Sequence, residues 1–144
     1  MVPLGVDKEK LFLQLNRLEE LLIQLENVKK SLLAKEKEFI LIPAIERLLQ
    51  ISIEECINIG NHIISGLMLK RADSYKEVFA ILREADILSK DTGAEMESFA
   101  KFRNKLVHLY WVVDKEELYA KLEQKNIIKS FVIEITKYLN KKLP

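Results

Sequence analysis

The stretch AIERLLQISIEECINIGNHIISGLML, residues 44–69, decides the fold because its apolar side chains recur at steps of three and four residues. That spacing places them along one side of an α-helix. Two such stripes run next to each other, so they cover more than one packing face and predict a helix with several neighbours. This apolar surface could serve the core of one chain or an interface between two copies. The stripes are Ile45, Leu48, Ser52, Cys56, Ile59 and Ile63, and Leu49, Ile53, Ile57, Gly60, Ile64 and Leu67.

The segments on either side of residues 44–69 also carry helical patterns with their own start signals. Upstream, Asp7 is a candidate N-cap for a long amphipathic helix, and Pro43 is tolerable only close to the start of the second helix. Downstream, three capping boxes predict three further helix starts, with a turn over residues 89–93 and a last segment compatible with one helix or two. The predicted fold class is all-α, an antiparallel bundle of four to five helices. The capping boxes are Ser74 with Glu77, Thr92 with Glu95, and Asp114 with Glu117.

Length and composition favour a single helical domain over residues 1–144. Of the 144 residues, 49% are hydrophobic and 31% charged, with only 4 Gly and 3 Pro, which favours helices joined by short turns. A domain of this size buries roughly 68 to 70% of its unfolded surface. Charges interrupt every apolar run before the roughly 18 residues that a membrane span needs, and the single Cys56 has no partner for a disulfide. We therefore expect a soluble cytoplasmic protein with Cys56 as a buried thiol.

Four polar side chains lie close together within the helical stretch FRNKLVHLYWVVD. At about 100° per residue on a straight helix, Arg103 and Tyr110 share one side, Asn104 and His108 share another, and His108 lies roughly 140° from Arg103. One straight helix therefore cannot bring all four groups to one phosphate. Either the helix deforms or ends near Val107, or a second copy of the chain contributes across a two-fold axis. The apolar seam that makes this segment a core-facing helix is Phe99, Phe102, Leu106, Leu109 and Val113.

The chemistry of these side chains suits cleavage of a phosphodiester. His108 can take or donate a proton near neutral pH, and Arg103 presents a planar fork that binds phosphate oxygens and stabilises added negative charge. Asn104 can orient the imidazole or bond to the substrate. Because 23 Lys and Arg face 22 Asp and Glu, the net charge is +1 and any phosphate binding must be local; Lys101 and Lys105 add such local charge. These groups could cleave RNA without a metal ion, but an Arg and a His on one helix are also common structural residues.

The string FRNKLVHLYWVVD, residues 102–114, resembles the signature of the HepT-like toxins of the HEPN superfamily. Members of that family carry an Arg, a spacer, a His and, in this branch, a Tyr two positions beyond. Here Arg103, Asn104, His108 and Tyr110 fill the motif positions. The upstream segments that resemble the second and third helices of the family are ISIEECINIGNHIIS, residues 51–65, and YKEVFAIL, residues 75–82, so the resemblance spans roughly residues 45 to 125.

The resemblance implies an HEPN-like helical domain that forms a two-fold homodimer, with the Arg and His of both subunits lining a shared cleft. It implies a metal-independent ribonuclease without a cofactor, the toxin of a toxin–antitoxin pair, silenced when a nucleotidyltransferase antitoxin transfers AMP to the motif tyrosine. By position, Arg103 and His108 would be catalytic, Asn104 would support them, and Tyr110 would accept the AMP. A nucleotide on Tyr110 adds bulk and negative charge where an RNA phosphate has to lie.

Two other functions stay open on the sequence alone. The chain could be a non-enzymatic helical partner of a minimal nucleotidyltransferase, or a structural bundle in which Arg103 and His108 satisfy a dimer contact. No metal site is predicted, because the chain lacks paired cysteines and Glu-x-x-His or His-x3-His spacings. His62, the only other histidine, is expected to cap a helix or pack at the surface, and Tyr75 and Trp111 are expected to be packing aromatics.

Overall fold

The computed structural model describes residues 5–34, 37–108 and 113–142. Across those ranges the chain forms six α-helices and no strand, which confirms the all-α fold class. The last predicted segment is two helices, because the chain turns at Gln124 and Lys125. The helices are α1 (Lys8–Leu33), α2 (Glu38–Gly66), α3 (Tyr75–Glu84), α4 (Lys90–Val107), α5 (Lys115–Glu123) and α6 (Asn126–Lys142).

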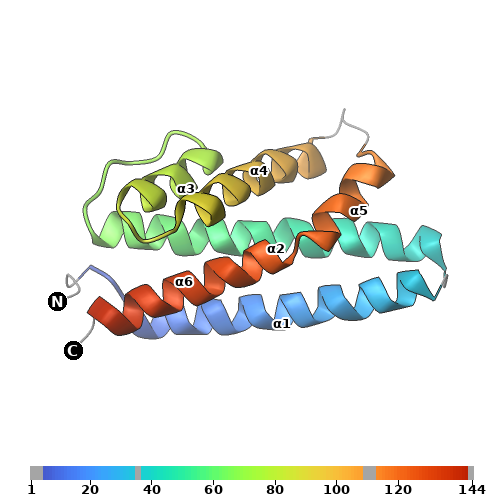
Figure 1. Ribbon diagram of the computed structural model, residues 1–144, viewed down its shortest axis with the longest axis horizontal. Helices are drawn as coiled ribbons and strands as arrows, with labels where there is room; N and C mark the ends of the chain where they lie inside the picture. Colours follow the sequence, from blue (N-terminus) through green and yellow to red (C-terminus); the bar gives the residue numbers. More distant parts are fainter. Residues whose placement is uncertain (1–4, 35–36, 109–112, 143–144) are drawn as a thin grey trace.

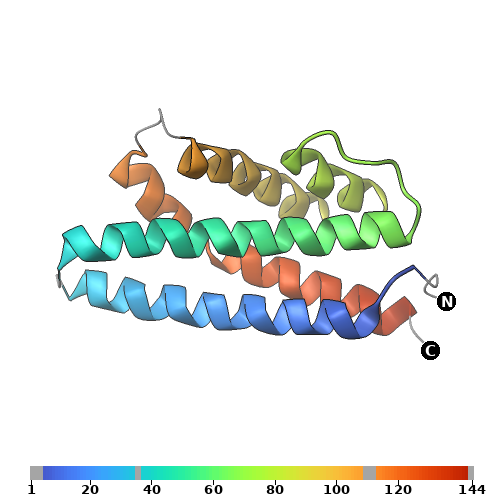
Figure 2. The same ribbon diagram turned by 180° about the vertical axis from the view of Figure 1, so that it is seen from behind.

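The helices pack around α2, which lies at the centre of the bundle. α1 and α2 form a long antiparallel pair, α6 runs along that pair, and α3 and α4 pack on the other side of α2 (Figure 1, Figure 2). α5 lies at the end opposite the two termini (Figure 1). Each of the other five helices contacts α2, which confirms the prediction of several neighbours. The two apolar stripes of α2 therefore serve the core of a single chain.

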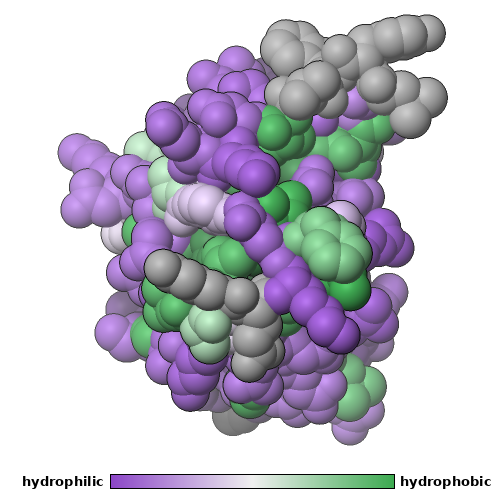
Figure 3. Space-filling model, turned by 90° about the vertical axis from the view of Figure 1, so that its right-hand side faces the viewer, coloured by the Kyte–Doolittle hydropathy of each residue, from purple (hydrophilic) through white to green (hydrophobic). Residues whose placement is uncertain are grey.

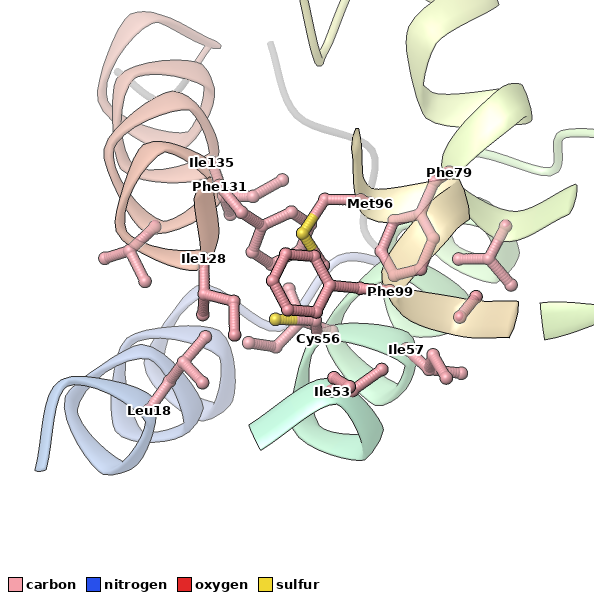
Figure 4. Packing of buried hydrophobic residues seen from close by; sticks show 14 of the residues in the cluster. Leu18, Ile53, Cys56, Ile57, Phe79, Met96, Phe99, Ile128, Phe131 and Ile135 are labelled. Carbon is pink, nitrogen blue, oxygen red and sulfur yellow. The ribbon is translucent and has the colours of Figure 1, made fainter. Parts of the chain in front are cut away.

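Aromatic and branched side chains from α1, α2, α3, α4 and α6 form the core (Figure 4). Phe79 of α3 and Phe131 of α6 meet edge to face, with ring centroids 5.9 Å apart and planes at 85°, an arrangement that aromatic pairs prefer. Cys56 is fully buried among these residues. Burial raises the pKa of its thiol well above the usual value, so Cys56 is a protonated core residue, as expected.

Three of the expected N-caps are confirmed. The side chains of Asp7, Ser74 and Asp114 each accept a hydrogen bond from a backbone N–H two or three residues later. Such bonds satisfy N–H groups in the first turn that have no partner within the helix. These three residues therefore fix the starts of α1, α3 and α5 where the sequence placed them.

The start of α2 lies upstream of the predicted position. The sequence placed it next to Pro43, whereas the helix begins at Glu38 and Pro43 lies inside it. Proline has no N–H, so the carbonyl of Phe39, four residues earlier, loses its usual partner in the helix. The unpaired carbonyl is tolerated because it lies in the exposed first part of the helix, where Phe39 and Pro43 both face solvent. An extra turn of helix is thus possible ahead of the proline.

The start of α4 also differs from the prediction. Thr92 was expected to be the N-cap after a turn over residues 89–93, but Ser89 is the N-cap and the helix begins at Lys90. The Ser89 hydroxyl accepts a hydrogen bond from the Thr92 backbone N–H at 3.2 Å. Glu134 on α6 adds to this cap, because its carboxylate accepts hydrogen bonds from the Ser89 backbone N–H at 2.6 Å and the Thr92 hydroxyl at 2.5 Å. A negative charge at a helix N-terminus is favourable. A local N-cap and a residue far along the chain therefore support this helix start together.

His62 holds the beginning of α1 against α2. Its Nε2 accepts a hydrogen bond from the Asp7 backbone N–H at 3.0 Å, which confirms its expected capping role. An acceptor nitrogen carries no proton, so the imidazole has its proton on Nδ1 when this bond is made. The bond ties two segments that are 55 residues apart in the sequence.

The surface combines polar side chains with isolated apolar ones. Figure 3 views the molecule from the end where α5 and the start of α2 lie, and hydrophobic atoms appear there as separate patches between hydrophilic ones. Leu33 and Phe39 are large apolar side chains with high exposure, 72% and 78%. Within the residues that the structure describes, no helix is long and apolar enough to span a bilayer.

Candidate active site

The polar cluster predicted from the sequence lies at the C-terminal end of α4. Arg103 and Asn104 are in the last turns of the helix, which ends at Val107. His108 is the C-cap, and its backbone is extended, with φ −84° and ψ 120°. The helix therefore ends at Val107, which is one of the two alternatives that the spacing of the four groups left open, and His108 leaves the helical spiral. Tyr110 lies outside the described residues.

Arg103 is held by residues from two other helices. Its Nε and Nη2 donate to the same carboxylate oxygen, Oε2 of Glu54 on α2, at 2.9 and 2.7 Å. Its guanidinium carbon lies 4.8 Å from the ring centroid of Tyr75, the first residue of α3, within the range of a cation–π contact. The Arg103 side chain is only 18% exposed. Its position is thus set by an ion pair along one edge and an aromatic ring beneath.

These contacts leave one edge of the guanidinium for a ligand. A guanidinium has five N–H donors in a fixed plane, and Glu54 takes the edge formed by Nε and Nη2. Nη1 has a long hydrogen bond, 3.4 Å, to Oδ1 of Asn104. The opposite edge, between Nη1 and Nη2, can still bind two oxygens at once, as arginine does with phosphate. Arg103 therefore has a defined orientation with its end-on fork available to an anion.

Glu54 remains ionised beside Arg103. Partial burial acts to raise the pKa of its carboxyl, but hydrogen bonds from Arg103 and Gln50 and the charge of Arg103 outweigh it, so the pKa is lowered overall. The amide of Gln50 donates to the same Oε2 atom at 3.2 Å. The carboxylate therefore accepts three hydrogen bonds, which fix its position on α2 as well as that of the arginine.

The two lysines expected to position phosphate lie away from Arg103 in the single chain. On a straight helix Lys101 and Lys105 are about 160° around the axis from Arg103. Lys105 donates to both oxygens of Glu117 on α5, at 2.9 and 3.1 Å, while Lys101 is exposed. The structure thus brings Arg103 and Asn104 together and places the lysines on another side of α4.

Two hollows adjoin this site between α2, α3 and α4. One, of about 230 Å³, is lined by Glu54, Ile57, Asn58, Tyr75 and Arg103. The other, of about 400 Å³, is lined by Tyr75 and Asn104 together with Asn61, Asp73, Ser74 and Val78. Tyr75 belongs to both hollows. The site around Arg103 therefore continues into a concave surface.

Sequence reasoning missed Glu54 and interpreted Tyr75 only as a packing aromatic. A signal for the former was present, because Glu54, Asn58 and Asn61 follow each other at steps of four and three, a polar line beside the apolar stripes of α2. Tyr75 gave no such signal, and its contact with Arg103 depends on how α3 packs. Among the described residues no three His, Cys, Asp or Glu side chains form a group that could hold a metal ion.

Comparisons with known proteins identify the family of the chain. The family model described as Ribonuclease HepT-like matches residues 14–135. Over 101 residues, 69% of this chain and 70% of its relative, the sequence is 27% identical to YutE of Bacillus subtilis (strain 168), which is provisionally named an RNase. It is 31% identical to the tRNA nuclease HepT of Aphanizomenon flos-aquae (strain 2012/KM1/D3) over 74 residues, 51% of this chain and 50% of that protein.

Solved structures share the fold. The structure of YutE, described as a cytosolic protein of unknown function, aligns with a TM-score of 0.82 at 24% identity, covering 96% of this chain and 94% of that one. A tri-AMPylated HEPN toxin of Shewanella oneidensis, in complex with its MNT antitoxin, aligns with a TM-score of 0.80 at 18% identity, covering 88% and 96%. The helical arrangement is thus that of HEPN toxins.

Proposed function

Because the chain belongs to the HepT-like ribonuclease family, we propose that it is a metal-independent endoribonuclease, the toxin of a toxin–antitoxin pair. The observation that carries the proposal is the oriented guanidinium of Arg103. Glu54 and Tyr75 hold this side chain and leave its end-on fork for a phosphate. A preorganised donor of this kind stabilises charge that develops in a transition state without having to reorganise.

In this mechanism the 2′-hydroxyl of RNA attacks the adjacent phosphorus. A neutral His108 takes the hydroxyl proton as the new P–O2′ bond forms, and a protonated imidazole gives a proton to the 5′ oxygen as the P–O5′ bond breaks. The products are a 2′,3′-cyclic phosphate and a 5′-hydroxyl. Arg103 binds the non-bridging oxygens throughout, and Asn104, already in contact with Arg103, bonds to the substrate or to the imidazole.

A homodimer would supply both imidazoles. Arg103 and His108 leave α4 in different directions, one along the helix side and the other after its end, so a second copy across a two-fold axis can complete the site. Two copies would also bring two guanidinium groups to one cleft, although Lys101 and Lys105 lie on another side of α4 and Lys105 is paired with Glu117. This local concentration of charge matters because the net charge of the chain is only +1.

The proposed partner is a nucleotidyltransferase antitoxin that transfers AMP to Tyr110. The HEPN toxin of Shewanella oneidensis is described as tri-AMPylated and bound to its MNT antitoxin. Here Tyr110 follows His108 by two residues, so added nucleotide would place phosphate charge close to the imidazole and compete with RNA. Both proteins would act in the cytoplasm, as the description of YutE as cytosolic suggests for a relative.

Cleavage of RNA by the purified, unmodified protein in the presence of a chelator tests the proposal. Arg103→Ala and His108→Ala should each lower the rate by about 10²–10³ or more, as loss of a transition-state donor does, with the helical circular dichroism unchanged. Arg17→Ala is the matched control, because Arg17 is 63% exposed and only 3.7 Å from a carboxylate oxygen of Glu55. If the two active-site variants cut RNA as fast as the parent, the assignment is wrong.

The competing function is a non-enzymatic partner of the nucleotidyltransferase. The ion pair of Arg103 with Glu54 favours this alternative, since the carboxylate offsets much of the positive charge that RNA would meet. This alternative predicts that the protein cleaves no RNA under any condition but forms a stable complex when it is co-expressed with the nucleotidyltransferase.

The intact mass of the protein after that co-expression tests whether Tyr110 accepts AMP. If AMP is still added to the Tyr110→Phe variant, Tyr110 is not the acceptor.

A further inference from the structure

The concave surface beside Arg103 has the chemistry of a base-binding site. We call it the Tyr75 groove and define it by Asn58, Asn61, Tyr75 and Asn104. These residues line the two hollows of about 230 and 400 Å³ that meet at Tyr75. Asn104 also contacts Arg103 through the bond of 3.4 Å, so the groove begins next to the fork that would bind phosphate.

The side-chain amides of Asn58 and Asn61 are available to form hydrogen bonds with a ligand. Asn58 and Asn61 are exposed, and within the described residues neither side chain has a hydrogen-bond partner. A carboxamide offers two donors and one acceptor oxygen, which complements the mixed edge of a nucleobase. Unpaired RNA bases are recognised in this way, by hydrogen bonds to their edges.

Tyr75 adds a ring on which a base can stack. The side chain is 42% exposed although its ring also contacts the Arg103 guanidinium. Proteins that bind single-stranded RNA place bases on such exposed aromatic side chains and on arginine planes. A packing aromatic, as the sequence suggested, would be more fully buried. The position of the ring therefore suits a ligand better than the core.

The charge of the groove favours a base over a second phosphate. Arg103 is the only cation that lines the two hollows among the described residues, whereas Glu54 and Asp73 are acidic. A second phosphate would meet these carboxylates without a compensating lysine. A neutral base with amino groups can instead donate to them.

We propose that the Tyr75 groove binds the base of the RNA nucleotide whose phosphate lies on Arg103, with the base stacked on Tyr75 and its edge bonded to the asparagine amides. This inference rests on the proposed ribonuclease function and adds a base-reading subsite to it. The enzyme then selects an unpaired nucleotide at the cut rather than phosphate alone.

Nuclear magnetic resonance of the wild-type chain tests binding directly, since each asparagine side-chain NH₂ gives its own signals. Ribonucleoside 3′-monophosphates should shift the signals of Asn58, Asn61 and Asn104 in a saturable way. Inorganic phosphate, which would bind only the Arg103 fork, should shift the Arg103 guanidinium and the neighbouring Asn104 but leave Asn58 and Asn61 unchanged. The exposed Asn140 on α6 is the internal control and should not move. Equal shifts at Asn140 and in the groove, or none in the groove, would overturn the proposal.

Cleavage kinetics give the second measurement. Asn61→Ala should raise KM for short RNA about two- to tenfold, the effect of one lost hydrogen bond, and change the base preference at the cut while kcat stays within a factor of about two. Tyr75→Leu should raise KM about 5- to 150-fold through lost stacking and should also lower kcat, because the Tyr75 ring supports the Arg103 guanidinium; Asn61→Ala is therefore the variant that isolates base binding. Asn140→Ala should change neither quantity.

The outcomes separate the two proposals. If the wild type cleaves RNA but Asn61→Ala keeps its KM and base preference and the amide signals do not respond to nucleotides, the groove proposal fails and the ribonuclease stands. If the wild type does not cleave RNA but nucleotides shift the three amides, the ribonuclease proposal fails while the nucleotide site stands.

Discussion

Replacing Glu54 with glutamine tests whether the carboxylate positions Arg103 or merely offsets its charge. Glutamine keeps the size and one oxygen acceptor but loses the charge. The pair is partly exposed, 18% for Arg103 and 30% for Glu54, so solvent screens it. Charged hydrogen bonds contribute about 1.5–3 kcal/mol when protected. After this screening we expect Glu54→Gln to lower the free energy of unfolding by about 1 kcal/mol, which is a Tm decrease of about 4 °C in a domain of this size.

The effect on catalysis has two opposing parts. A phosphate on the end-on fork would lie about 7 Å from the carboxylate, given a hydrogen-bond length on each side of the guanidinium, and their repulsion is on the order of 2 kcal/mol before salt screening. Removing it should lower KM a few-fold. Loss of orientation matters more, because a misplacement of about 1 Å can cost 10²-fold in rate. We therefore expect kcat to fall about ten- to a hundredfold while KM falls slightly.

Steady-state cleavage of a short RNA and thermal unfolding measure these effects. Glu97→Gln is the matched control, because the Arg83–Glu97 pair has a similar length of 2.6 Å and similar exposure of 31% and 25%. That variant should lose comparable stability and keep kcat. If Glu54→Gln retains kcat and only lowers KM, the carboxylate offsets charge and does not position Arg103, and the argument for a preorganised fork fails.

The same variant has a pH signature. The folded-state pKa of Glu54 lies below its usual value of 4.5, so the ionised carboxylate adds stability above the pKa of the unfolded chain. That contribution is lost as the pH falls through the lower, folded-state pKa. Glutamine does not titrate there. The stability difference between the parent and Glu54→Gln should therefore be constant near neutral pH and shrink below about pH 4.5.

Three further predictions concern the scaffold. Gly60→Ala would place a Cβ 2.5 Å from Cγ1 of the stiff Val78 side chain. We expect this clash to lower the free energy of unfolding, measured by chemical denaturation, by about 1–3 kcal/mol. Met68, just after the end of α2, has φ 56° and is 90% exposed. Glycine adopts this left-handed conformation without strain, so Met68→Gly should raise the free energy of unfolding by about 0.5–1 kcal/mol, measured as a higher Tm. Glu134→Gln removes the charge that binds the Ser89 N–H and should lower the free energy of unfolding by about 1–2 kcal/mol. Faster hydrogen exchange at the start of α4 is the specific measurement.

Local signals in the sequence were sufficient for most of the fold. The period of α2 predicted its several neighbours, and Asp7, Ser74 and Asp114 marked helix starts because N-capping depends on residues within one turn. The prediction for the start of α4 was wrong. Ser89, and not Thr92, is the N-cap and accepts a hydrogen bond from the Thr92 N–H, and Glu134, which lies 42 residues beyond Thr92, bonds to both residues. No pattern near Thr92 indicates that contact. Long-range hydrogen bonds of this kind follow from packing, which the local sequence does not encode.

The same distinction applies to the site. The motif identified Arg103 and His108 as candidate site residues, and their spacing left two alternatives open, a helix that deforms or ends near Val107 or a second copy of the chain. It did not predict what holds Arg103, because Glu54 and Tyr75 lie 49 and 28 positions earlier in the sequence. Glu54 was detectable in part, as the first member of a polar line on α2. Its pairing with Arg103 depends on how α4 packs against α2.

The position of Glu54 on α2 links the core to the proposed chemistry. α2 contacts each of the other five helices, so it is the element whose displacement would cost the most packing. Glu54 on this helix holds the guanidinium of Arg103, whereas His108 follows the end of α4, where the last backbone carbonyls lack helical partners. If Arg103 binds phosphate as proposed, that binding is set by the core of one chain, whereas His108 lies beyond the last turn of α4. A second copy of the chain or an antitoxin bound there could control proton transfer without changing how Arg103 is held.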